Sequence, residues 1–126
     1  MSDINNPLDK FGKFIVENMR DKGIEYYDKL ALGLWKAPSL QSLQEDLKQF
    51  DEKQLSIIRR CIVSTIDDAM HDFLFALQAS SDLNHGIQVT INEQNVAELS
   101  DGLNGEPYTE DGWYAKYSSF GENVKK

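Results

Sequence analysis

Four side chains that could bind a metal or catalyse a reaction lie close together in the segment STIDDAMHDFLFAL. They are Asp67, Asp68, His71 and Asp72. Carboxylate oxygens combined with one imidazole are ligands that suit Mg²⁺ or Mn²⁺. A metal held there would orient a phosphate group or activate water, with His71 and Asp67 as the catalytic residues. One hypothesis is therefore a metal-dependent hydrolase of phosphorylated small molecules that uses this cluster.

Two other interpretations of the same cluster need no metal. On a helical wheel, Asp67 and His71 fall on one polar side, and they are four residues apart, so they can pair within a purely structural stripe. The stripe can also form part of a protein-binding surface. Because the ligand set is incomplete for a catalytic centre, we predict no catalytic residues, metal or cofactor, with the Mg²⁺ or Mn²⁺ site as the alternative.

The helix that would carry the cluster is predicted to run from about Glu52 to Ala79. Asp51 and Gln54 have the spacing of an N-terminal capping box, and a helix of this length would be about 40 Å long. We expect it to be the central helix of the fold. The residues expected to form its buried face are Leu55, Ile58, Ile62, Ile66, Ala69, Phe73 and Leu77.

Around this helix the sequence predicts a mainly α-helical (α+β) fold of a single domain, residues 1–126. Three helices precede it: one from Pro7 to a stop at Gly23, a second over 24–36 and a short third over 39–50. Alternating residues predict a strand over 86–92, followed by a second short strand over 96–99. Trp113, Tyr117 and Phe120 favour a last short helix, although a strand is also compatible with WYAKY. The expected architecture is a four-helix core with a long central helix, a small β-hairpin and an aromatic C-terminal segment.

Composition favours a soluble cytoplasmic protein. The single cysteine, Cys61, cannot form an internal disulfide, which favours a reducing compartment. The N-terminal residues do not have the pattern of a signal peptide, and no apolar run is long enough to span a bilayer. The sequence also contains no nucleotide-binding or hydrolase motif.

Charge is distributed very unevenly along the chain. The formal net charge is −8, and from Cys61 to Ala115 there is no Lys or Arg. Nucleic-acid binding requires basic surface, so a nucleic-acid partner is not expected, whereas a basic protein partner suits an acidic surface. The stretch 93–114 is the preferred contact surface, with the polar stripe of the long helix as a second choice. The expected contact residues of the stretch 93–114 are Glu93, Glu98, Asp101, Glu106, Tyr108, Glu110, Asp111, Trp113 and Tyr114.

A tyrosine pair flanked by acidic residues makes one short stretch of the chain similar to a known class of proteins. Tyr26 and Tyr27 lie between Glu25 and Asp28, and this short stretch resembles the acidic helical surface of colicin-nuclease immunity proteins. The resemblance implies a small, cofactor-free bacterial protein whose acidic face docks on a basic toxin and blocks it. We therefore predict a non-enzymatic acidic protein-binding domain of immunity type. The sequence leaves the partner's identity and the oligomeric state open.

Overall fold

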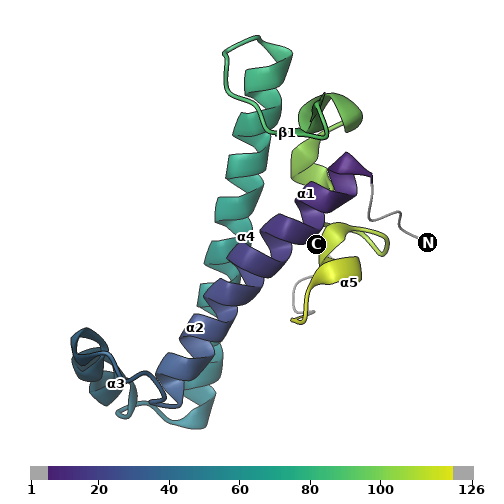
Figure 1. Cartoon of the computed structure of the whole chain (residues 1–126). Coiled ribbons are helices and arrows are strands. Elements are labelled where there is room, and N and C mark those ends of the chain that lie inside the picture. Colours follow the sequence, from purple (N-terminus) through teal and green to yellow (C-terminus); the bar gives the residue numbers. More distant parts are fainter. Residues whose placement is uncertain (1–5, 121–126) are drawn as a thin grey trace.

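The computed structural model describes residues 6–120 and is mainly α-helical, with one small two-stranded sheet. Helix α4 (Glu52–Asp82) runs almost the whole length of the molecule (Figure 1). Beside it, α1 (Pro7–Ile15), the π-helical turn η1 (Val16–Arg20) and α2 (Asp21–Ala31) form one continuous helical run in the opposite direction. The predicted long central helix and mainly α fold are confirmed.

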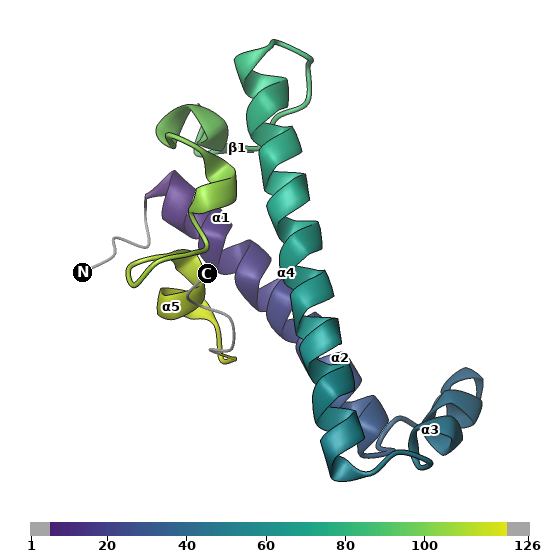
Figure 2. The same cartoon turned by 180° about the vertical axis from the view of Figure 1, so that it is seen from behind.

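The other elements are attached to this helix pair at different places. Figure 2 shows the short helix α3 (Gln41–Leu47), which follows the 3-10 turn η2 (Pro38–Leu40), projecting at one end of the pair. The residues that follow α4 (83–120), called the C-terminal half below, include the last helix, α5 (Trp113–Tyr117). They lie along one side of the helix pair in both views. The short helix expected near Trp113 is therefore present.

The first helix begins as predicted but does not end where the sequence suggested. The Asn6 side chain accepts a hydrogen bond from the Leu8 backbone N–H (2.8 Å), and Pro7 occupies the first helical position. Gly23 lies inside α2 and does not terminate it: a Cβ at this position would be 2.9 Å from Cδ1 of Ile66, so glycine allows α2 to approach α4 closely. The helix instead ends at Ala31, close to Gly33, whose φ of +69° suits glycine.

Helix α4 begins with the predicted capping box. The Gln54 backbone N–H donates to Asp51 (2.8 Å), and the Asp51 backbone N–H donates to the Gln54 side chain (2.9 Å). The buried face of the helix, however, is rotated by about one residue from the predicted one. Leu77 is buried as expected, whereas Phe73 is 45% exposed. The buried residues of α4 are Val63, Asp67, Met70, Leu74, Leu77 and Ser80.

The β-hairpin is present but much shorter than predicted. β1 (Thr90–Ile91) pairs antiparallel with β2 (Gln94–Asn95), and both turn residues between them have positive φ, the geometry of a tight hairpin turn. The strand expected over 96–99 is a 3-10 helix, η3 (Val96–Leu99), because the Asn95 side chain accepts from the Ala97 backbone N–H (3.0 Å) and caps it. A further 3-10 turn, η4 (Leu103–Gly105), then packs on α4.

The hydrophobic core joins the C-terminal half to the helix pair. Trp113 packs edge-on against Phe11 and directly over Gly12, where a Cβ would collide with its ring. The buried apolar residues of this core are Phe11, Ile15, Val16, Met70, Leu74, Leu77, Val96, Ala97, Leu103, Trp113 and Tyr114. Within residues 6–120, no helix combines the length and hydrophobicity needed to cross a membrane.

Candidate functional site

Asp67, which the sequence placed among possible catalytic and metal-binding residues, forms a buried ion pair. Nε of Arg20 donates to Asp67 Oδ1 (2.6 Å), and Nη2 donates to Oδ2 (3.4 Å). Both side chains are fully buried, with 0% of their surface exposed. The Asp67 carboxylate is therefore held by the chain's own cation, and it could ligate a metal only if Arg20 were displaced.

Arg20 also binds the end of the C-terminal half. Its Nη1 donates to Ser118 Oγ (2.9 Å) and to the Phe120 carbonyl oxygen (2.5 Å). Its guanidinium lies over the Tyr114 ring, 4.2 Å from the ring centroid. Burial, and then the negative charge of Asp67, raise the pKa of Tyr114 above its ordinary value. The Arg20–Asp67 pair thus fixes the last described residues onto the helix pair.

The other three members of the cluster lie at the surface. His71 is half-buried, and its Nδ1 is 3.3 Å from Oδ1 of the exposed Asp72. Asp67 thus pairs with Arg20, and His71 with Asp72; this corrects the expected Asp67–His71 pairing. Among the residues that the structure describes, no group of three or more His, Cys, Asp and Glu side chains is arranged to hold a metal ion.

A surface hollow brings the helix stripe and the acidic stretch together. It has a volume of about 440 Å³ and is lined by Asp68 and His71 of α4 and by Asn104, Gly105 and Tyr108 of the C-terminal half. We call it the Asp68–Tyr108 hollow. Residues nearly forty positions apart in sequence therefore share one site, because η4 packs on α4. The two surfaces that the sequence offered as separate candidates meet at this hollow.

Tyr108 is held in the hollow by a hydrogen bond and by contacts between aromatic rings. Its hydroxyl donates to the Asp67 backbone carbonyl (3.4 Å), and its ring packs edge-on against Tyr114, with centroids 5.6 Å apart. The centroid of the His71 ring lies 6.4 Å from that of Tyr108. Burial, and then the charges of Asp67 and Asp68, raise the pKa of Tyr108, so the phenol is neutral at physiological pH. The hollow combines a rigid aromatic ring with an exposed carboxylate.

The predicted contact residues of the stretch 93–114 divide into surface and core. Glu106 is half-buried and accepts a hydrogen bond from Ser100 Oγ (2.5 Å). Trp113 and Tyr114 are each only 1% exposed, so they are core residues and do not contribute to a contact surface. The sequence suggested otherwise because it could not show that Gly12 makes room for the indole. The exposed acids of the stretch are Glu93, Glu98, Asp101, Glu110 and Asp111.

Most of the negative charge in the base-free stretch stays at the surface. Asp67 is matched by Arg20, while Lys13, Lys29 and Arg59 pair with acids of the N-terminal half, which leaves them unavailable to the stretch. Seven exposed acids of the base-free stretch form no ion pair within 4.0 Å with any Lys or Arg side chain of residues 6–120. They are Asp68, Asp72, Asp82, Glu93, Glu98, Asp101 and Asp111.

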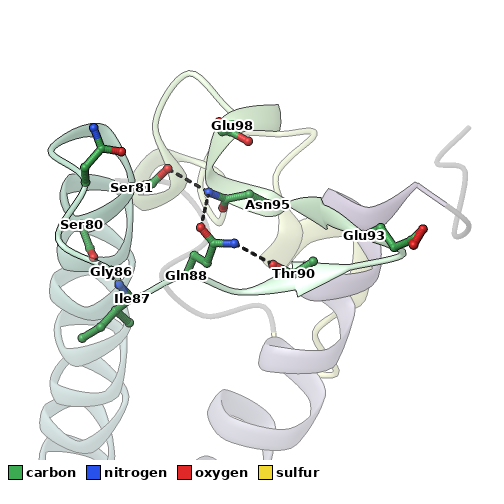
Figure 3. Close-up of a pocket in the computed structure, with 10 residues that line it drawn as sticks. Ser80, Ser81, Gly86, Ile87, Gln88, Thr90, Glu93, Asn95 and Glu98 are labelled. Carbon is green, nitrogen blue, oxygen red and sulfur yellow. Dashed lines mark hydrogen bonds between the residues drawn. The ribbon is translucent and has the colours of Figure 1, made fainter.

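A second hollow, of about 320 Å³, lies between the end of α4 and the hairpin (Figure 3). Asn95 donates to Ser81 Oγ (3.0 Å) and to Gln88 (3.3 Å), and Gln88 donates to Thr90 Oγ1 (3.0 Å). These side chains bind one another and hold the hairpin against α4. Sequence reasoning missed this hollow because neutral amides and hydroxyls in loops have no distinctive spacing.

Comparison of the chain with the profiles of known protein families, with curated proteins and with solved structures found no match. We therefore infer function from the residues of the acidic surface itself.

Proposed function

We propose that this protein is a non-enzymatic binding domain whose acidic surface docks on a basic protein, in the manner of an immunity protein on its toxin. The surface consists of the Asp68–Tyr108 hollow together with the acids Asp72, Asp82, Glu93, Glu98, Asp101 and Asp111. The observation that supports the proposal is that these acids and Asp68 form no ion pair with a Lys or Arg side chain of residues 6–120, while the Tyr108 ring lies beside Asp68 in the hollow.

The hollow suits the side chain of an incoming Lys or Arg. Asp68 offers a carboxylate for an ion pair, and the Tyr108 ring offers a face for a cation–π contact, worth about 0.5–2 kcal/mol. The neutral Tyr108 hydroxyl is already bound to Asp67, which keeps the ring in place. A partner that presents a basic residue here would find its site preformed.

Charge would act mainly on the rate of association. A net charge of −8 attracts a basic partner over a distance of about one Debye length, roughly 8 Å at physiological salt. Such steering raises association rates toward 10⁸–10⁹ M⁻¹ s⁻¹ at low salt and fades as salt increases. Contact with the acidic surface would then cover the partner's basic surface and block whatever that surface binds.

Binding of a fluorescein-labelled octa-arginine peptide, measured by anisotropy at low salt, tests the surface. We expect the double variant Asp68→Asn, Asp72→Asn to bind the peptide at least about tenfold more weakly than the wild type, because it loses the central carboxylates. The matched control is Asp46→Asn, Glu52→Gln, which changes the net charge equally on exposed residues at the far end of the molecule. Equal weakening by both double variants, or no binding by the wild type, would contradict the proposed surface.

The metal-dependent hydrolase remains a separate alternative with its own test. A specific Mg²⁺ or Mn²⁺ site at Asp68, His71 and Asp72 predicts that a hundredfold excess of metal over its dissociation constant stabilises the fold by about 2.7 kcal/mol. The denaturation midpoint should then differ clearly between metal and EDTA. The binding proposal expects the two curves to coincide.

A further inference from the structure

Two aspartate–tyrosine pairs lie next to each other in this fold, one in the core and one at the surface. Asp67 and Tyr114 are buried, whereas Asp68 and Tyr108 line the surface hollow. The two aspartates are consecutive residues of α4, and the two tyrosine rings pack edge-on, with centroids 5.6 Å apart. The group that the buried pair holds is therefore a guide to the group that the surface pair can bind.

The buried pair holds a guanidinium group. Arg20 donates from Nε to Asp67 Oδ1 (2.6 Å) and from Nη2 to Oδ2 (3.4 Å), and its guanidinium lies 4.2 Å from the centroid of the Tyr114 ring. One planar cation thus contacts both oxygens of a carboxylate and packs on an aromatic ring at the same time. The ammonium group of lysine is a compact point charge, so it has no plane to stack on a ring and no fork to match a carboxylate.

The surface pair offers the same two groups to a cation from another molecule. Asp68 is exposed and forms no ion pair within 4.0 Å with a Lys or Arg side chain of residues 6–120. After burial and Asp67, the charges of Asp68 and Asp72 also raise the pKa of Tyr108, as carboxylates close to a phenol do. The hollow adds the side-chain amide of Asn104, which forms no hydrogen bond with any residue from 6 to 120.

We propose that the hollow prefers arginine to lysine and takes the guanidinium of one arginine side chain of the basic partner. This inference rests on the proposed function and adds which basic residue the partner presents. The guanidinium would pack on the Tyr108 ring and donate two hydrogen bonds to the Asp68 carboxylate. The side-chain oxygen of Asn104 would accept a further one of its five N–H donors.

Lysine would make only part of these contacts. Its ammonium group would keep the attraction to Asp68 but would lose the stacking on Tyr108 and one of the two bonds to the carboxylate. It is also more strongly hydrated than a guanidinium, so entry into a hollow lined by protein costs it more. We expect the two differences together to make the dissociation constant for lysine about tenfold higher than that for arginine.

Fluorescein-labelled octa-arginine and octa-lysine, which carry the same charge, test this preference by anisotropy at one salt concentration. We expect the wild type to bind octa-arginine about tenfold more tightly than octa-lysine. Tyr108→Leu should reduce that ratio to about threefold or less, because the ring that stacks on the guanidinium is gone. Tyr108→Phe is the matched control: it loses the same hydroxyl hydrogen bond to the Asp67 carbonyl but keeps a ring, so it should keep the ratio.

A second pair of variants leaves the packing of residue 108 untouched. Asp68→Asn removes the carboxylate at an exposed position and should also lower the ratio, because the two-point contact with the guanidinium is lost. Asp101→Asn removes an exposed acid that does not line the hollow, so it should weaken both peptides equally and leave the ratio unchanged. Far-UV circular dichroism checks that each variant keeps its helical fold.

The outcomes separate this inference from the proposed function. Equal affinity of the wild type for the two peptides would overturn the arginine preference while the acidic surface still binds both. A ratio that Asp68→Asn leaves unchanged, or that Tyr108→Leu and Tyr108→Phe lower equally, would overturn the role of the hollow. Failure of the wild type to bind either peptide would contradict the proposed function and this inference with it.

Discussion

Removing the Asp67 carboxylate should be among the most destabilising single changes in this protein. In Asp67→Ala, the Arg20 guanidinium stays fully buried and loses both hydrogen bonds to its anion. Ser118 Oγ and the Phe120 carbonyl, which also accept hydrogen bonds from Arg20, are neutral. Breaking one side of a buried ion pair costs about 3–5 kcal/mol, because a buried charge loses the opposite charge beside it. That is a large share of the 5–15 kcal/mol by which domains are typically stable.

Two further variants show whether buried charge is the cause. Asp28→Ala breaks a partly exposed pair with Arg59 (2.8 Å) between α2 and α4, and it should cost about 0.5–1 kcal/mol, since water screens this pair. The double variant Arg20→Met, Asp67→Leu removes both charges and should recover most of the stability lost in Asp67→Ala. Recovery should be incomplete because the Phe120 carbonyl loses one of its two donors, Nη1 of Arg20, and keeps the Ser118 hydroxyl.

Urea unfolding followed by far-UV circular dichroism measures these differences, with the slope of the transition checked for constancy. A cost below about 1 kcal/mol for Asp67→Ala would refute the reasoning. So would a double variant no more stable than Asp67→Ala, because the loss would then come from packing and not from an orphaned charge.

Two glycine-to-alanine substitutions should change the free energy of unfolding, measured in urea, by different amounts. Gly12→Ala should destabilise the fold by about 1–3 kcal/mol although alanine favours helix, because its Cβ would collide with the Trp113 ring. Gly23→Ala should be near neutral, because only the flexible end of the Ile66 side chain is close. Stability should also fall above about pH 10, because the unfolded chain releases the Tyr114 proton there while the folded state, with its raised pKa, retains it. Tyr114→Phe should reduce this fall by about 1.4 kcal/mol in total between pH 9 and pH 11, measured by unfolding at each pH, and an unchanged pH dependence would contradict the pKa direction.

The sequence predicts well those elements that depend on local signals. The cap at Asn6, the Asp51 capping box, the long helix and the last short helix are all encoded by neighbouring residues, and each is present. The stop predicted at Gly23 fails because glycine can end a helix or allow close packing, and only the tertiary contact with Ile66 distinguishes the two. The strand over 86–92 fails because alternation cannot show how far a hairpin pairs.

The sequence does not identify the buried face of α4, because two neighbouring stripes of this helix have helical spacing. The sequence predicts that the more apolar stripe, which contains Phe73, is buried, whereas the fold buries the stripe that contains Asp67. That choice depends on Arg20, which is 47 residues away and neutralises Asp67 inside the protein. The same contact explains why the acidic cluster seemed to be one site: only three of its four members are at the surface.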